Sequence, residues 1–119
     1  MKYPEAMYWH ASEFYLKVGD TGRALELLQK NLELRPNSTS LVALARAEMA
    51  SSKATEARAS IDRALAMPVR SAALFWVASV VYRGDPAKAE EFHARAVRMN
   101  PRIDEDEVLP ALRTAKSPP

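Results

Sequence analysis

The chain has no cysteine, only three glycines, and few aromatic side chains, at 8% of its 119 residues. Without cysteine it can form neither a disulfide nor a thiolate metal site, and no redox compartment is indicated. Gly19, Gly22 and Gly84 fall in or directly beside predicted turns between helices, which excludes a glycine-rich phosphate-binding loop. Sustained alternation of apolar and polar residues is also missing, so no strand is predicted.

Long apolar runs and a strong charge of one sign are missing as well. The longest nearly apolar run, over 72–82, is about half the ~20 residues that a membrane span needs, and it predicts a buried helix. The net charge is +2, and basic and acidic residues are mixed along the chain. This balance is too mild to imply a nucleic-acid or membrane-surface partner, and no membrane insertion is expected. No secretion signal opens the sequence, so we expect a cytoplasmic location, or a periplasmic one if a signal has been removed.

The chain does contain a repeated sequence pattern. Ala24, Ala57 and Ala89 are spaced 33 and 32 residues apart, in similar sequence contexts. Each of the three copies of this pattern ends in a proline: Pro36, Pro68 and Pro101. A period of this length predicts an array of helical hairpins in which each unit stacks on the next. The hydrophobic fraction of 48% favours one folded domain over 1–115, followed by a disordered tail at 116–119.

Capping residues and prolines predict seven helices, at about 5–17, 21–34, 38–50, 53–66, 71–82, 86–99 and within 104–115. Asp85 is suited to cap a helix, and Pro86 suits the first helical position. Short loops make consecutive helices antiparallel, which predicts repeats at about 5–37, 38–69 and 70–102. The last helix, at about 104–115, would cover the open end of the array.

These units resemble the tetratricopeptide repeat (TPR) family over residues 5–101. The first unit carries most of the matching residues: Tyr8, Ser12, Tyr15, Gly19, Ala24, Leu28, Leu32 and Pro36. The second unit matches through Leu44, Ala45, Ala57, Ile61, Ala64 and Leu65, and the third through Gly84, Ala89, Ala96, Val97 and Pro101. The resemblance implies an all-α fold, a right-handed superhelical stack of antiparallel helical hairpins (a TPR-like α-solenoid) of about seven helices.

Three residues depart from the family pattern. Asn31 stands where the other units have alanine, Glu48 where the first unit has tyrosine, and His93 where the others have leucine or isoleucine. The spacings are also a residue or two short, which leaves the phase of the fifth helix open between Trp76 and Val77.

In this family the first helix of each hairpin lines a concave face that binds other proteins. Carried over to this chain, the resemblance implies a groove lined by Trp9, Glu13, Leu16, Val42, Arg46, Met49, Leu74, Ala78, Val81 and Tyr82. Such a groove is mostly apolar and suits an amphipathic helix or an extended apolar segment of a partner protein. The clamp with which some relatives hold a C-terminal carboxylate is not expected, since the corresponding places lack cationic donors.

No catalytic, cofactor or metal site is predicted. His10 and Glu13 could share a metal, but two ligands make a poor site. His93 is expected to be a partly buried histidine bonded to a neighbour, and the acidic run from Asp104 to Glu107 is expected to serve a helix start. We therefore predict a non-enzymatic adaptor or scaffold that binds a protein or peptide. Two alternatives remain open: a self-associating module that forms a homo-oligomer through the same face, and a small chaperone for a secretion or assembly subunit.

Overall fold

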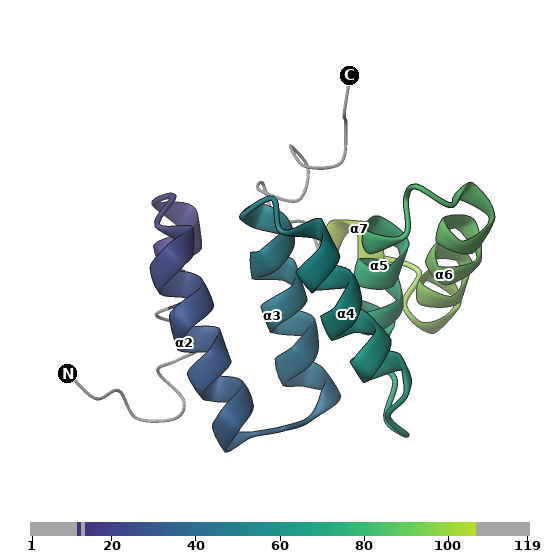
Figure 1. Cartoon of the computed structure of the whole chain (residues 1–119). Helices are drawn as coiled ribbons and strands as arrows, with labels where there is room; N and C mark the ends of the chain where they lie inside the picture. The colour runs from purple at the N-terminus through teal and green to yellow at the C-terminus, as the bar shows by residue number, and fades with distance from the viewer. Residues whose placement is uncertain (1–11, 13, 107–119) are drawn as a thin grey trace.

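The computed structural model describes residue 12 and residues 14–106 of the chain (Figure 1). Within these residues the secondary structure is helical, without strands, which confirms the all-α class. Residues 14–17 are helical, and six further helices follow: α2 (Thr21–Leu34), α3 (Ser38–Ala50), α4 (Ala54–Leu65), α5 (Ala72–Val81), α6 (Pro86–Met99) and α7 (Ile103–Asp106). The predicted capping helix begins in α7, and the rest of it lies outside the described residues, as does most of the predicted helix at 5–17.

Side-chain caps define where most of these helices begin. Four of them start with an oxygen that accepts a backbone N–H three residues on: Asp20 (α2), Asn37 (α3), Ser71 (α5) and Asp85 (α6). Each cap satisfies a donor that the first helical turn leaves free. Lys53, before α4, is the exception and makes no side-chain cap.

The turns within the hairpins occupy matched places in the sequence. Gly19 has φ of +84° in the first turn, and Ser52, which is 33 residues later, has φ of +61° in the second. Gly84 stands at the same place in the third. A left-handed conformation is cheap for glycine and strained for serine, so the middle hairpin carries the least favourable turn.

Successive helices run up and down and pack side by side (Figure 1). α2 packs on α3, α3 on α4 and α5 on α6, while α5 also contacts both α3 and α4. The short α7 packs on α5 and α6. The third hairpin therefore rests on both helices of the second.

The core follows the repeated small residues. Ala24 and Ala57 are fully buried, and Ala89 is half-buried. The main cluster joins α3, α4 and α5 and contains Leu41, Val42, Ala45, Met49, Ala57, Ile61, Ala64, Leu74, Val77 and Ala78. Small residues let the helix backbones approach, and the larger ones fill the space beside them.

The phase of α5 is now fixed. Val77 is fully buried in the main cluster, whereas Trp76 is half-buried at the contact with α7. Of the two residues that the sequence left open for the core position, Val77 therefore takes it and Trp76 does not. The indole N–H of Trp76 explains why, because it needs a polar partner and finds one in Asp104.

Candidate functional site

Most of the described residues predicted to line the groove are part of the core. Val42, Met49, Leu74 and Ala78 are at most 5% exposed and share the cluster that joins α3 to α5. Val81 packs against the same cluster from a half-buried position. The fold thus brings these five residues together, and burial leaves four of them little surface for a partner.

The other predicted groove residues have different surroundings. Leu16 is half-buried and packs against the separate cluster formed by α2 and α3. Arg46 is half-buried on α3. Trp9 and Glu13 lie outside the described residues. The accessible part of the predicted groove therefore consists of Leu16, Arg46 and Val81, and their role in partner binding stays a prediction.

Tyr82 is the predicted groove residue with the most defined chemistry. It ends α5, is 8% exposed, and its hydroxyl donates a hydrogen bond to Asp62 of α4. The guanidinium of Arg58 lies 4.4 Å from the ring centroid, and the Lys88 ammonium lies 5.2 Å from it. The Asp62 hydrogen bond, followed by burial, raises the pKa of Tyr82. The side chain thus connects α4 to the third hairpin.

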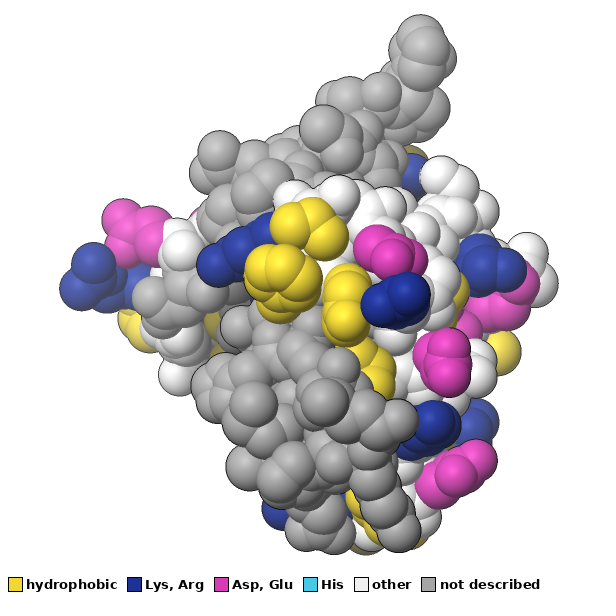
Figure 2. Space-filling view, turned by 90° about the vertical axis from the view of Figure 1, so that its left-hand side faces the viewer, with side chains coloured by type: hydrophobic (Ala, Val, Ile, Leu, Met, Phe, Trp, Pro, Cys, Tyr) yellow, Lys and Arg dark blue, Asp and Glu magenta, His cyan; other side chains and the backbone are white. Residues whose placement is uncertain are grey.

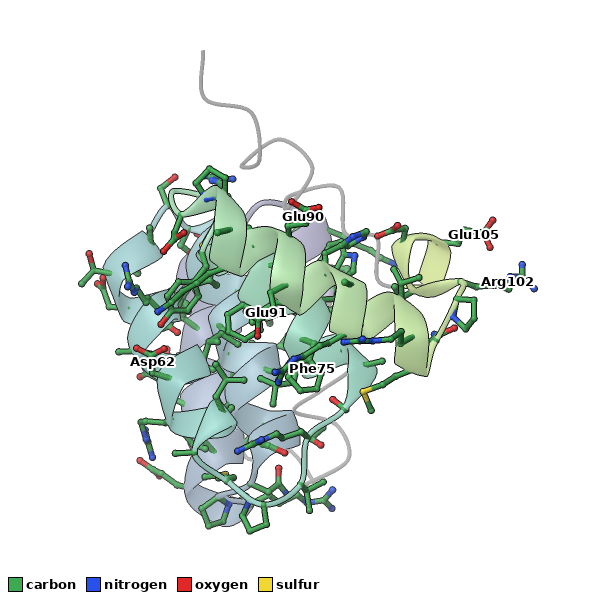
Figure 3. The ribbon with its side chains drawn as sticks, turned by 90° about the vertical axis from the view of Figure 1, so that its right-hand side faces the viewer. Asp62, Phe75, Glu90, Glu91, Arg102 and Glu105 are labelled. Carbon is green, nitrogen blue, oxygen red and sulfur yellow. The ribbon has the colours of Figure 1, made fainter. Side chains whose placement is uncertain are left out.

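Aromatic packing continues from Tyr82 along α6. The Phe92 ring lies 5.6 Å from that of Tyr82 and 6.3 Å from that of Phe75, centroid to centroid. The Arg95 guanidinium, paired with Glu91 at 3.1 Å, lies 5.6 Å from the Phe75 ring. Figure 3 shows Phe75 beneath α6 and Asp62 on the side of α4. Aromatic and cationic side chains therefore fill the contact between α5 and α6 within the third hairpin, and Tyr82 extends it to α4 of the second.

All three departures from the repeat pattern make hydrogen bonds between helices. The Asn31 amide donates to the Ser40 hydroxyl at 3.0 Å, and the Ser60 hydroxyl donates to a Glu48 oxygen at 2.7 Å. His93 Nε2 lies 2.9 Å from Asp104 Oδ1. The sequence shows that each of these residues departs from the repeat pattern, but its hydrogen-bond partner can be identified only from the structure.

Burial perturbs the side-chain carboxyl of Glu48. Desolvation raises its pKa, and the hydrogen bond from Ser60 partly offsets that effect. A buried carboxyl with a raised pKa can mark a catalytic acid, but structural networks produce the same shift. Glu48 and Ser60 are both at most 7% exposed, inside the middle hairpin. We therefore interpret the pair as a structural link between α3 and α4.

Asp104 holds α7 against the third hairpin. Its Oδ1 accepts a hydrogen bond from Trp76 Nε1 at 2.9 Å and lies at the same distance from His93 Nε2. Next to it, Ile103 is 1% exposed and joins a cluster with Phe75 and Ala96. The expectation of a hydrogen-bonded, partly buried His93 is confirmed, and the acidic start of the last helix serves as an anchor.

Exposed apolar residues lie at the helix ends and turns. Among the described residues, five large ones are more than half exposed: Phe14, Val18, Leu34, Val69 and Met99. Figure 2 shows hydrophobic side chains gathered on the α2 end of the molecule, with charged side chains beside them.

Within the described part of the chain, no three histidine, aspartate or glutamate side chains gather so that they could hold a metal ion. None of the helices that the structure describes is both long enough and apolar enough to cross a membrane. Comparisons with protein-family models, with curated proteins and with solved structures found no match for this chain.

Proposed function

We propose that the chain is a non-enzymatic adaptor that binds a peptide or helix of a partner protein. The binding face would be formed by the first helices of the hairpins, as the resemblance to tetratricopeptide repeats implies. The main support is the packing of α5, which rests on both helices of the preceding hairpin. If the same contact is made between the other units, it favours a solenoid in which the first helices share one side.

The chemistry of this face follows from the accessible side chains. Leu16, Arg46 and Val81 are half-buried, and each contributes part of its surface. Trp9 and Glu13 belong to the same predicted face. An apolar strip with one cation and one carboxylate suits an amphipathic segment, whose apolar side chains enter the strip while its polar side chains remain in water.

The test is capture of proteins from a native lysate, identified by mass spectrometry, with wild type and the double variant Trp9→Ala/Val81→Ser. Leu74→Ala is unsuitable, because Leu74 is fully buried and its truncation would leave a cavity in the core. The matched control is Val69→Ser, which removes an apolar side chain that is 71% exposed elsewhere. We expect the double variant to lose the captured proteins while circular dichroism stays helical. Capture equal to wild type would contradict the proposed face.

Self-association is the second candidate, and one observation favours it. Phe14 and Val18 are 59% and 60% exposed at the first turn, and hydrophobic side chains gather at this end in Figure 2. A second copy could cover them. Light scattering over a wide concentration range decides the question, because a mass that stays monomeric throughout would remove this candidate.

A further inference from the structure

Helix α3 is buried on every side except one narrow face. Of its 13 residues only Thr39, Arg46 and Ala50 are not buried. Their spacing of seven and then four residues places them on one face of the helix. On one flank of this face Ala43 packs in the cluster with α2, and on the other Val42 packs in the cluster with α5. The face of α3 that is not buried therefore lies between its two neighbours.

Helix α5 has such a face in the corresponding place. Ala73, Trp76 and Val80 are half-buried, and their spacing of three and then four residues puts them on one side of the helix. Each face points away from the other helix of its own hairpin, which packs on the side of Glu48 in α3 and of Phe75 in α5. Because α3 and α5 pack against each other, both faces lie on the same side of the stack.

We call these six residues the open strip, and its side chains are mostly small or apolar. Ala50 and Ala73 leave room for the backbone of another segment to approach closely. Val80 and Trp76 offer apolar surface beside them, and Arg46 is the charged member. Covering such a surface with further apolar side chains removes it from water and is favourable.

The chain leaves α7 directly beside the open strip. Asp104 of α7 accepts a hydrogen bond from Trp76, a member of the strip, and Ile103 is buried against Phe75 and Ala96. These contacts fix the point from which residues 107–115 continue. Neighbouring helices lie about 8–10 Å apart, and nine residues can extend over about 30 Å, so this segment is long enough to pass from α5 to α3.

The sequence of residues 107–115 suits such a cover. It contains three large apolar residues, Val108, Leu109 and Leu112, and few charged ones. A segment joined to the fold this closely has an effective concentration on the order of millimolar. A second copy of the chain, or a separate partner, would need a comparable concentration to compete at equal affinity. The tether therefore favours this segment as the occupant of the open strip.

We propose that residues 107–115 cover the open strip as an internal ligand. Their apolar side chains would lie on Ala50, Ala73 and Val80, and a partner that binds the same side of the stack would have to displace them. This regulatory role rests on the proposed adaptor function, because the open strip belongs to the first helices of the hairpins. The cover itself does not depend on that function.

The test is the rate at which a thiol reagent labels a single cysteine in the open strip of the full chain, which has no cysteine of its own. The reporters are Ala50→Cys on α3 and Val80→Cys on α5. Adding Leu109→Asp/Leu112→Asp should raise both labelling rates about tenfold or more, because a carboxylate resists burial on an apolar surface and the segment would be released. Leu112→Ser alone, a milder change, should raise them by a smaller factor.

The matched control is Ser117→Asp/Pro118→Asp, which adds the same charge outside residues 107–115 and should leave both rates unchanged. A cysteine at the exposed position Ala94 of α6, introduced as Ala94→Cys, should label at one rate in all backgrounds. Circular dichroism of each variant excludes unfolding as the cause of faster labelling.

Two results would overturn the proposal. One is equal labelling of the open strip with the wild-type segment and with either leucine variant, because the strip would then be uncovered. The other is protection that grows with protein concentration, because a second copy would then be the cover. Labelling needs no partner, so the cover can be confirmed while capture of partner proteins fails, and the reverse also holds.

Discussion

The middle hairpin, α3 and α4, and the third hairpin, α5 and α6, use different side chains for similar packing. α3 buries ten of its 13 residues, including the carboxyl of Glu48. α6 buries only Ala96 among its 14 residues, and aromatic rings fill the contacts beside it. The middle hairpin has described neighbours on both sides, α2 and α5, which explains its deeper burial.

Turn conformation and helix capping, in contrast to burial, are more favourable in the third hairpin than in the middle one. The middle hairpin turns through Ser52 at φ of +61°, and Lys53 gives α4 no side-chain cap. The third hairpin turns at Gly84, with a cap from Asp85 and a proline in the first turn of α6. Packing against two neighbours stabilises a helix more than capping does, so the middle unit tolerates poor local chemistry. The third hairpin, which is less buried, has the more favourable turn and cap.

The largest expected effect on stability comes from truncating buried isoleucines, and two of them test the difference in burial between the hairpins. Ile61 lies in the cluster between the second and third hairpins, and Ile103 lies in the four-residue α7. We expect Ile61→Ala to lower the free energy of unfolding by about 3–5 kcal/mol, because helices enclose the cavity. Ile103→Ala should cost about 2 kcal/mol, since a short helix can relax into the space. Urea unfolding followed by circular dichroism measures both, and a larger loss at Ile103 would reverse the comparison.

The next largest effect on stability is expected at the hydrogen-bonded pair of Glu48 and Ser60 within the middle hairpin. Ser60→Ala removes the hydroxyl that donates to Glu48 and leaves a buried carboxylate without that hydrogen bond. We expect a loss of about 1–3 kcal/mol at neutral pH, measured by the same unfolding experiment. A matched control is Ser52→Ala, at an exposed serine of the same hairpin. Equal losses in the two variants would contradict a specific role for the pair.

The raised pKa of Glu48 predicts the sign of a pH effect. Because the folded state favours the protonated form, its contribution to stability is fully present below about pH 4.5, the ordinary glutamate pKa. The contribution is lost as pH rises through the raised pKa. Glu48→Gln, which stays neutral, should therefore gain stability relative to wild type as pH increases. Unfolding curves at several pH values test this, and a constant difference between the two proteins would exclude it.

Tyr82 offers the corresponding test of the contact between the second and third hairpins. Tyr82→Phe keeps the ring beneath Arg58 and Lys88 but removes the hydrogen bond to Asp62. We expect a loss of about 1–2 kcal/mol near neutral pH. Because the pKa of Tyr82 is raised, this contribution is present below about pH 10 and is lost as pH rises through the raised value. Wild type and variant should therefore converge in stability at alkaline pH, and a gap that widened there would be the contrary result.

The smallest effects on stability are expected from substitutions that improve the turn of the middle hairpin, at Ser52 and Lys53. Ser52→Gly relieves the left-handed serine, and Lys53→Asp supplies the missing cap of α4. Each should stabilise the protein by about 0.5–1 kcal/mol, seen as a rise in thermal midpoint. Gly19→Ser, at the matched turn with φ of +84°, should lower the midpoint. A rise on Gly19→Ser would show that the turns are not equivalent.

Local signals made much of the fold predictable. The bounds of α2, α3 and α6 agree with the prediction, because caps and prolines at their ends act within a few residues. α4 and α5 are slightly shorter than expected, and α4 is the helix without a side-chain cap. The phase of α5 could not be read from the sequence, since Val77 and Trp76 are both apolar and only the contact with Asp104 separates them.

The candidate sites depended more on tertiary structure. The repeat predicted which helices face a partner, but the packing of α5 on α3 determines that Val42 and Leu74 are core residues. The partners of Asn31 and Glu48 lie nine and 12 residues away, on neighbouring helices.

Native-state hydrogen exchange tests most directly the claim that the middle hairpin supports a stack of hairpins. The account predicts that amides of α3 and α4 exchange slowest, those of α6 faster, and those of α7 fastest, in line with their burial. Slower exchange in α6 than in α3 would contradict it, because the third hairpin would then be the stable unit on which the others rest.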